Sequence, residues 1–585
     1  MTRSGPEQEE PSSRVSAVRE AFARRVPHVV GAYLLSAWAL VEFVNWLVVR
    51  YGGSAGWVDA LFTALALQAP LVAYLAWFHG RPGRDRWYRA QWTAFTISLV
   101  AGTALCALAF HRAPTADRGF ATTVVPTAAN TVAVLPFDDL SEAQDAAYLA
   151  DGFTTEIGSA LSRLTDLRVV SRSSSFQFQN QPEDIRKIAA QLGVANVLEG
   201  SIRRSGDRIR VNVQLSSASD GFEVWSDSYD RQLADVFAIQ DEISVAVVNA
   251  LRLHVPAGLI GNAADNHSKS LEAYDHYLRG RYFWNERTLE GLQKAEQQFQ
   301  AAVAIDATYA AAYAGLSDVY VSFYDYGFLS LDETNAKAKE SAERALALNP
   351  RLAEAHTSLA HLDLHYWRWT QGERRFRRAL ELDPNSAQAH HWYALALTAL
   401  GHVDRAVDQL RIARNLEPLS TLMNADFGMA LYAAKRFDEA VVQELKTLEL
   451  DPTSRTAMWI LGLSYEGMGR YDEAIAQFES TLALNPTSIN LKSSLAHTYA
   501  RVNRIEDAQA LLAELLSQSE DAEFPAYTVA VVSVGLGNHD EALRWLEKTY
   551  EQNSGWVRYL KVDTRLDPLR SDPRFTALIN KIGLP

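Results

Sequence analysis

The stretch LGLSYEGMGRYDEAIAQFESTLALNP, residues 461–486, has the pattern of two short helices that pack against each other. The positions that define this pattern are Leu461, Gly462, Tyr465, Gly469, Ala474, Phe478 and Pro486. The small residues let the two helices approach closely, while Tyr465 and Phe478 fill the gap between neighbouring units. Pro486 ends the second helix, because proline lacks the N–H that a helix interior needs. The stretch therefore predicts a helical hairpin.

Prolines at intervals of 34 residues indicate that this hairpin is repeated. They are Pro350, Pro384, Pro418, Pro452 and Pro486, and Asn or Asp precedes four of them. A period of 34 residues is that of the tetratricopeptide repeat (TPR), a helix-turn-helix unit. Weaker copies on both sides bring the array to about eight units, which is enough to bury a continuous core. We predict a TPR solenoid over residues 271–550 and a C-terminal cap over residues 551–585.

A mixed α/β pattern precedes the repeats. Val132–Leu135 is a short β-branched run stopped by Pro136, as is typical of a buried strand. Apolar residues at helical spacing follow between residues 146 and 164, and Leu167–Ser171 is predicted as a second strand. Residues 197–204 and 208–215 flank a Ser-Gly-Asp turn, and the second arm alternates apolar with polar side chains. The order βαβα, then antiparallel strands and a helix, predicts a compact mixed α/β domain.

Six segments of this domain carry a family resemblance. They are VAVLPF from Val132, YLADGFTTEI from Tyr148, RVVSRSSSF from Arg168, LGVANVLEGSIRRSGDRIRVNVQL from Leu192, WSDSYDR from Trp225 and DVFAIQDEI from Asp235. Over residues 131–252 the chain resembles the TolB amino-terminal-like domain. That domain occurs in membrane-bound bacterial proteins with TPRs, including relatives of CadC-type regulators and of some adenylate cyclases. The resemblance implies a bacterial envelope protein, and it brings no agreed chemistry.

Three apolar stretches, residues 26–49, 57–78 and 92–110, precede the α/β domain, and each is about long enough to cross a bilayer. Arg residues are concentrated before the first stretch and between the second and third, which places the N-terminus in the cytoplasm by the positive-inside bias. We predict a multi-pass protein of the bacterial inner membrane, with the residues after about 112 in the periplasm. Glu42 in the first span is most simply neutral or hydrogen-bonded, and an ion or proton pathway is the alternative.

The predicted fold class is multidomain and mainly α, with three transmembrane helices, a mixed α/β domain and a TPR α-solenoid. Its parts are a cytoplasmic tail (1–25), a three-span membrane region (26–112), a linker (113–130), the TolB-like domain (131–252), a second linker (253–270), the solenoid (271–550) and the cap (551–585). The tail is too short for the winged helix of CadC-type proteins. The membrane spans fill the space that a cyclase domain would need.

Charge excludes one class of partner. Residues 1–112 hold 11 Arg, no Lys and seven acidic residues, which leaves 45 basic and 63 acidic residues, a net charge of −18, in residues 113–585. Because such a surface repels phosphate backbones, we expect no nucleic acid as a partner. The one cysteine, Cys106, excludes a disulfide framework within the chain and a CxxC redox pair.

The sequence contains no recognisable catalytic motif. It has no GxxxxGK loop and no GxSxG elbow, and the SRSSSF stretch from Ser171 has no nearby histidine to activate a hydroxyl. His361 and His365 are four residues apart on a predicted helix and could share a metal ion. However, HLDLH lacks the glutamate base of an HExxH site, and no third ligand is evident in the sequence. We therefore predict no enzymatic activity, no cofactor and no metal, and we interpret both histidines as groove or packing residues.

A partner-binding surface is predicted from the repeat register. By resemblance to known TPR folds, positions 5 and 9 of each first helix line the concave face. They include the predicted partner-binding residues Thr357, His361, His391, Leu395, Met429, Trp459, Leu463 and His497. This apolar, aromatic and histidine-rich set suits an apolar helix or an extended segment. The alternative is that several of these side chains pack against neighbouring repeats.

The sequence as a whole predicts a non-catalytic, membrane-anchored scaffold. Its partners are proteins or peptides, bound through the repeats outside the cytoplasm, and the lipid bilayer. The alternative is an envelope sensor or regulator that signals through its membrane spans to a separate cytoplasmic partner. The oligomeric state does not follow from the sequence.

Overall fold

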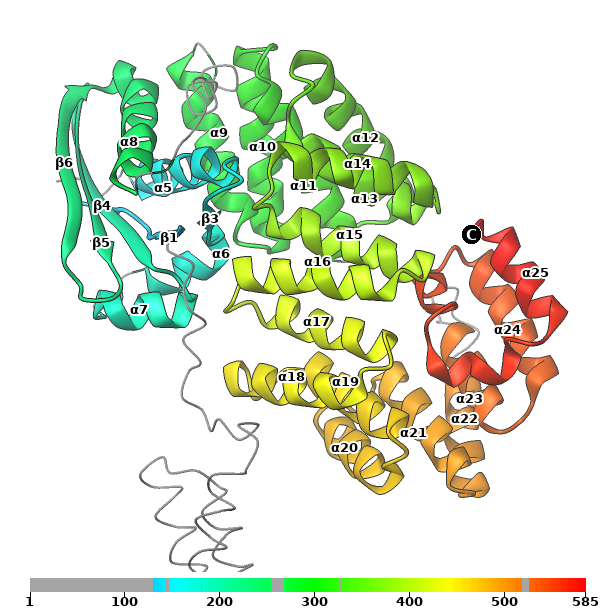
Figure 1. The fold of residues 1–585 in the computed structure, drawn as a ribbon. Helices are drawn as coiled ribbons and strands as arrows, with labels where there is room; N and C mark the ends of the chain where they lie inside the picture. The colour runs from blue at the N-terminus through cyan, green and yellow to red at the C-terminus, as the bar shows by residue number, and fades with distance from the viewer. Residues whose placement is uncertain are drawn as a thin grey trace, which may run out of the picture. The chain divides into compact units, whose positions relative to one another are not determined.

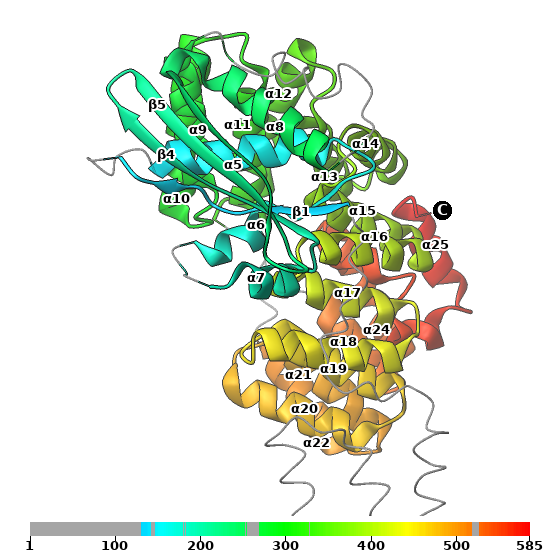
Figure 2. The same cartoon turned by 60° about the vertical axis from the view of Figure 1, so that its left-hand side comes forward.

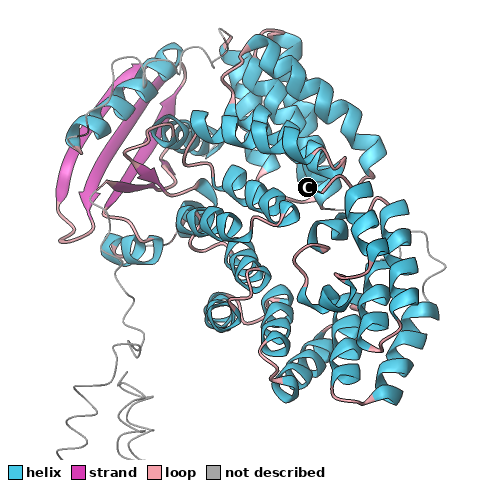
Figure 3. Cartoon of the chain, turned by 45° about the vertical axis from the view of Figure 1, so that its right-hand side comes forward, coloured by secondary structure: helices cyan, strands magenta, loops and turns pink. Residues whose placement is uncertain are grey.

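The computed structural model describes residues 130–584, apart from 142–146, 180, 182, 252, 254–267, 269, 327 and 518–525. The chain divides into two compact units, Met1–Val124 and Val125–Pro585, and every described residue belongs to the second. This unit begins with an α/β region and continues as a long series of helices (Figure 1). All of its strands lie in the α/β region, as the magenta ribbon in Figure 3 makes plain.

The length and composition of the described helices contradict the predicted location in the membrane. Among the described residues, no helix combines the length and the apolar character needed to cross a bilayer. The prediction of a multi-pass inner-membrane protein with a periplasmic portion is therefore wrong by this measure. The three predicted spans, residues 26–49, 57–78 and 92–110, lie outside the described residues, as does Glu42.

The α/β region is built on a mixed sheet. Its strands are β1 (Thr131–Val134), β2 (Asp138–Asp139), β3 (Arg168–Val169), β4 (Asn196–Ser205), β5 (Arg208–Ser217) and β6 (Glu223–Gln232). The order is β3-β1-β4-β5-β6, and β2 pairs with β4. β1 is parallel to β3 and β4, whereas β4, β5 and β6 form an antiparallel meander. The predicted hairpin is thus present, with Ser205 opposite Arg208.

Alternation along β5 decides which face of the sheet is covered. The inward side chains Ile209, Val211, Val213 and Leu215 are at most 2% exposed. They share one apolar core with helices α5 (Ala147–Ser162) and α8 (Val236–Ala250). Helix α7 (Ile185–Leu192) packs with residues of β1 and β4 in a second, smaller core. Figure 2 shows these helices around the sheet.

The second predicted strand, Leu167–Ser171, is shorter in the structure. β3 ends at Val169, and the chain then enters the short helices α6 (Arg172–Ser175) and η1 (Phe176–Phe178). The physical reason is a tertiary contact, because the Ser171 N–H donates to the carbonyl of Leu416 in the repeats at 2.9 Å. That N–H is then no longer available to extend the sheet.

Sixteen helices in the described residues form the TPR α-solenoid as eight consecutive pairs. They are α9 (Leu271–Trp284), α10 (Leu289–Ile305), α11 (Ala310–Asp325), α12 (Leu331–Leu348), α13 (Ala353–His365), α14 (Trp369–Leu382), α15 (Ala387–Leu400), α16 (Val403–Leu416), α17 (Thr421–Ala433), α18 (Phe437–Leu450), α19 (Arg455–Gly467), α20 (Tyr471–Leu484), α21 (Ile489–Arg501), α22 (Ile505–Ser517), α23 (Ala526–Gly535) and α24 (His539–Glu551). Two 3₁₀ helices, η4 (Gly555–Tyr559) and η5 (Thr564–Leu569), and helix α25 (Pro573–Lys581) follow them.

The turn inside six of the eight pairs has the same backbone conformation. Residues 367, 401, 435, 469, 503 and 537, at intervals of 34, all have positive φ between 54° and 80°. Each reverses the chain in the left-handed region after a first helix, as a helix C-terminus commonly requires. The residue before each repeat proline lies outside the helical region instead, as for Asp383 with φ −137°, because a following proline disfavours that region. Both backbone conformations recur with the 34-residue period.

Candidate binding surface of the repeats

The predicted partner-binding residues lie on the first helices of five successive pairs. Thr357 and His361 are on α13, His391 and Leu395 on α15, Met429 on α17, Trp459 and Leu463 on α19, and His497 on α21. We call the surface formed by these eight residues the inner face. Leu395, Met429 and Trp459 are half-buried, while the other five side chains are buried.

The inner face is occupied by the chain itself. Residues 553–570, which we call the C-terminal segment, contain η4 and η5 and return to the middle of the solenoid. Met429, Trp459 and Leu463 line one small cavity together with Trp556 and other residues of this segment. His361 and Leu395 line another cavity with residues 553–558. Five of the eight predicted residues are thus brought together around the C-terminal segment.

Aromatic stacking holds the segment against α19 and α23. The ring of Trp556 lies parallel to that of Tyr527, with centroids 5.4 Å apart and planes at 12°. Its edge meets Trp459 at 6.1 Å and 89°. Trp459 in turn donates its indole N–H to the Ser494 hydroxyl on α21 at 2.9 Å. Aromatic pairs of these geometries contribute about 0.5–1.5 kcal/mol each beyond the area they bury.

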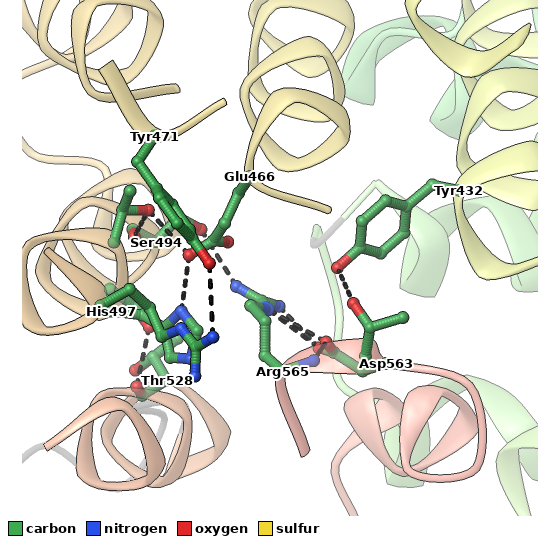
Figure 4. Close-up of polar contacts among 12 residues, drawn as sticks. Tyr432, Glu466, Tyr471, Ser494, His497, Thr528, Asp563 and Arg565 are labelled. Carbon is green, nitrogen blue, oxygen red and sulfur yellow. Dashed lines mark hydrogen bonds and ion pairs between the residues drawn. The ribbon is translucent and has the colours of Figure 1, made fainter. Parts of the chain in front are cut away.

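A buried ion pair fixes the next turn of the segment. Arg565 donates two hydrogen bonds to Asp563, and its Nη1 reaches the Ser494 hydroxyl at 3.2 Å (Figure 4). The Tyr527 hydroxyl donates to the same carboxylate at 2.7 Å. Burial alone would raise the pKa of Asp563, but the Arg565 guanidinium and the tyrosine hold that pKa below its ordinary value. Every polar group here is paired, as a buried charge requires.

Three further hydrogen bonds connect distant parts of the chain. Lys561 donates to the carbonyl of Leu400 at the end of α15, and Asn553 donates to the carbonyl of His365 at the end of α13. Beyond the segment, the Trp369 indole at the start of α14 donates to the carbonyl of Ile582. Figures 1 and 2 both place the red C-terminal elements beside α15.

The inner-face histidines His391 and His497 pair with acids of a neighbouring repeat. His391 Nε2 lies 2.5 Å from Asp426 Oδ2, and His497 Nδ1 lies 2.6 Å from Glu466 Oε1 (Figure 4). Burial would raise the pKa of Glu466, yet His497 and Arg565 keep it below its ordinary value. Thr357 donates its hydroxyl to the carbonyl of Ala353 in its own helix. These three side chains line neither of the two cavities described above.

A third inner-face histidine belongs to a cluster of possible ligand atoms. His361 Nε2 lies 3.0 Å from Asp325 Oδ1 at the end of α11, and 3.1 Å from His365 Nε2. His365 Nε2 is 3.7 Å from the same carboxylate oxygen. Burial lowers the pKa of His365 to about 4. Burial would raise the pKa of Asp325, but the two histidines hold it well below its ordinary value. Sequence reasoning found both histidines and missed the aspartate, which lies 36 residues before His361.

One buried acid was also missed. Glu444 on α18 is fully buried, packs directly on Gly428 of α17, and neither carboxyl oxygen has a hydrogen-bond partner in the described residues. Burial, with a further contribution from Asp426, raises its pKa to about 10. The helical register of Glu444 was a usable signal, since it falls on the face that packs against the preceding helix.

Comparisons with known families place TPRs in the second half of the chain. Residues 376–408, 425–489, 466–530 and 530–548 each match a tetratricopeptide repeat family. Residues 128–245 match the family described as HilA/YgeH-like transcriptional regulator, second domain. This second match covers the α/β region, for which the TolB resemblance stays a prediction.

A relative from Rhizobium meliloti (strain 1021) bears the name "Putative adenylate cyclase 3" and is 36% identical over 218 residues. The alignment covers 37% of this chain and 36% of the relative, so the chain spans about a third of that curated protein. Among solved structures, the TPR protein YrrB, described as having an unusual peptide-binding site, is 19% identical, with 33% of this chain and 95% of that chain covered and a TM-score of 0.27. A TPR protein from Parabacteroides merdae is 16% identical, with 46% and 98% covered and a TM-score of 0.35.

The family matches and the helix pairs agree on the nature of the repeats. Units of this kind bury a continuous core and leave an extended surface for binding. The chain is therefore a mainly helical protein with a TPR α-solenoid and a small mixed sheet region, the architecture of a protein-interaction scaffold.

Proposed function

We propose that the chain is a non-catalytic scaffold that binds protein or peptide partners on the inner face of its solenoid. The observation that carries this proposal is the C-terminal segment, which occupies that face through Trp459, Met429 and Leu463. A surface that accommodates a folded segment of its own chain, built of two short 3₁₀ helices, has the shape and chemistry to accept a segment of another protein. Leu395 is the fourth proposed contact. His361 lines the same cavity as Leu395, and Thr357, His391 and His497 complete the proposed surface.

The chemistry of the C-terminal segment indicates what a partner should carry. An aromatic side chain fits against Trp459 and Tyr527, and an acid–base pair can replace Asp563 and Arg565 beside Ser494. Because the segment already covers these side chains, a partner reaches them by displacing it. Partner affinity is then reduced by the free energy that docks the segment.

The same reasoning assigns roles to the predicted domains. Residues 271–550 supply the binding surface, residues 551–585 supply its internal occupant, and residues 131–252 form a module fixed to the repeats. The enzymatic alternative suggested by the name of the Rhizobium meliloti relative has less support. The alignment covers only about a third of that protein, and no recognisable catalytic motif occurs in this sequence.

Site-specific photocrosslinking tests the binding surface. A photoreactive amino acid at Leu395 or Met429, on the inner face, is compared with one at Leu445 or Leu484, which are 46% and 64% exposed on second helices. We expect adducts to a partner protein from the inner-face positions only, together with an internal adduct to residues 553–570. Partner adducts of equal yield at all four positions would contradict the proposed surface.

Two tryptophans that touch each other give a matched pair of variants. Trp556→Ala weakens the internal occupant, so we expect partner adducts at Met429 to increase. Adding Trp459→Ala to that variant removes the contact on the repeat side and should weaken partner capture by about thirtyfold, as for a typical interface anchor of about 2 kcal/mol. Thermal unfolding of each variant serves as the control for folding. Equal capture by all folded variants would place the partner elsewhere.

A regulatory role is the second candidate, favoured by the match of residues 128–245 to the HilA/YgeH-like regulator domain. In this version, a partner bound to the repeats acts on the α/β region through the contacts that join them. Asn385, beside Pro384, donates to the carbonyls of Ser162 and Leu167 at 2.7 and 2.9 Å. Hydrogen exchange at Val169, whose N–H donates to the Asn385 side chain, would rise on partner binding if this coupling operates.

A further inference from the structure

Two histidines and a carboxylate converge at one end of the inner face. His361 and His365 are separated by one turn of α13, so their side chains project from the same face of the helix. Asp325 is the last residue of α11, the first helix of the preceding pair. The three ligand atoms, His361 Nε2, His365 Nε2 and Asp325 Oδ1, all lie within 4.8 Å of one another.

We propose that Asp325, His361 and His365 bind a divalent transition-metal ion, with Zn²⁺ as the ion that suits them best. Two imidazole nitrogens and one carboxylate oxygen form a ligand set that zinc accepts in sites with an open fourth position. Carbonyl and carboxylate ligands alone would favour calcium or magnesium, whereas imidazoles favour zinc and its neighbours in the first transition row.

The distances fit a tetrahedral ion. With metal–ligand bonds of about 2.0–2.1 Å, the ligand atoms of a tetrahedral site lie about 3.4 Å apart. The three separations here are 3.0, 3.1 and 3.7 Å, so they fall on both sides of that value. Side-chain movements of a few tenths of an ångström would bring all three atoms to bonding distance of one ion.

The rings are already held in place by aromatic neighbours. His361 stacks on Trp392 with ring centroids 3.8 Å apart and planes at 20°. His365 meets Tyr324 edge-on at 4.6 Å and is perpendicular to His361. Because these contacts restrict both imidazoles, little side-chain freedom would be lost when an ion binds. Ligands placed this way are preorganised.

A water-sized space is present beside the histidines. Their cavity is lined by His361, His365, Leu395, Asn553 and Arg558, among others, and has a volume of about 20 Å³. A water molecule needs about 10–15 Å³ of such a cavity, so one can complete the coordination. The cavity wall also carries the Arg558 guanidinium, whose charge opposes a cation, and His361 Nδ1 has no hydrogen-bond partner in the described residues. We therefore expect weaker binding than in a closed four-ligand zinc site.

Metal binding by the full chain, without an affinity tag and stripped with a chelator, tests the proposal. The probe is Zn²⁺ alone, measured by calorimetric titration and by metal analysis after dialysis. We expect saturable binding of one ion per chain above the weak background from other surface histidines. Co²⁺ in place of Zn²⁺ should give the visible absorption of a tetrahedral site with mixed nitrogen and oxygen ligands.

Two ligand variants and one control variant test whether these residues form the site. Asp325→Asn keeps the size of the side chain and can still accept from His361, whereas His365→Ala removes a ligand on the same helix. Each should weaken Zn²⁺ binding by more than about 100-fold, beyond the effect of losing a supporting contact, and abolish the Co²⁺ spectrum. His402→Ala, which removes an exposed histidine before α16, is the matched control and should change neither. Absence of saturable binding in the parent chain, or undiminished binding in folded Asp325→Asn and His365→Ala, would overturn the proposal and leave a hydrogen-bonded cluster only.

Discussion

At the scale of single residues, Glu444 makes stability depend on pH. Its pKa is about 10 in the folded chain against an ordinary 4.5, because burial penalises the charged form. The folded chain therefore retains a proton that the unfolded chain releases above pH 4.5. Its contribution to stability is fully present below that pH and is lost as the pH rises toward 10. By this linkage the group lowers stability by about 3 kcal/mol between pH 4.5 and 7.

Glu444→Gln should remove that dependence, since the amide has the same shape and no charge to bury. We expect a free energy of unfolding about 1–3 kcal/mol higher at pH 7, and a flatter slope between pH 5 and 9. Urea unfolding at several pH values measures both quantities. An unchanged slope would mean that Glu444 is ionised in the folded chain.

Arg565 should be among the least replaceable residues of the C-terminal segment. Arg565→Leu leaves Asp563 buried without its counter-charge, which typically costs about 3–5 kcal/mol. The double variant Asp563→Asn with Arg565→Leu removes the stranded charge and should recover part of that loss. Denaturant unfolding of the two single variants and the double variant gives the coupling energy. A double variant that is no more stable than Arg565→Leu would contradict this account of the pair.

The chemical role of a side chain could be predicted only where its partners lie close to it in the sequence. The histidines at 361, 391 and 497 were found from repeat register, but their acidic partners lie 31 to 36 residues away on another helix pair. No local pattern links the members of such a pair. The interpretation of His361 and His365 without a third ligand failed to find Asp325 for the same reason.

At the scale of elements, six helix pairs share a turn position with positive φ, which is glycine in three pairs and another residue in the other three. Gly401, Gly469 and Gly537 alternate with Trp367, Lys435 and Asn503 at the same left-handed position. Gly469→Ala should destabilise by about 1–2 kcal/mol, because a Cβ there clashes with its own backbone and meets no other atom within 4 Å.

The matched control for Gly469→Ala is Gly158→Ala. Gly158 lies inside α5, and a Cβ there also meets nothing within 4 Å. In that helix interior alanine should instead stabilise by about 0.5–1 kcal/mol. Thermal unfolding of the two variants should therefore shift in opposite directions. Shifts of the same sign would contradict the conformational explanation.

Helices and strands were predicted best where the sequence has one clear period of apolar or repeat-defining residues. The 34-residue spacing and the alternation in residues 208–215 gave the repeats and the hairpin, because each element buries its own stripe of apolar residues. The strand expected at 167–171 was cut short by the Leu416 carbonyl, a tertiary contact that a strand pattern does not contain.

At the scale of the whole described unit, Asn385 joins the α/β region to the repeats. Asn385→Ala should leave the carbonyls of Ser162 and Leu167 and the N–H of Val169 without this partner, at a cost of about 1–3 kcal/mol. We expect faster hydrogen exchange at Val169 and little change within α19–α22. Thr453→Ala changes the equivalent position two repeats later, where the hydroxyl bonds only to Asp451, and should leave Val169 protected. Equal protection in both variants would show that other contacts hold the two regions together.

The return of the C-terminal segment was beyond sequence reasoning. Residues 551–585 were predicted as a cap, which extends the last unit, since repeat patterns describe neighbours only. Contacts such as Lys561 with Leu400 and Trp369 with Ile582 span 161 and 213 residues and follow from no periodicity.

Those long-range hydrogen bonds change how the solenoid should respond to force. An open array of repeats behaves as a linear spring, in which each unit unfolds almost independently of the units far from it. Here Trp369 at the start of α14 donates a hydrogen bond to the carbonyl of Ile582, which follows α25. Stretching the helices between these two residues first has to break that hydrogen bond. Pulled from α13 and α24, the chain should resist until one abrupt release and only then extend unit by unit.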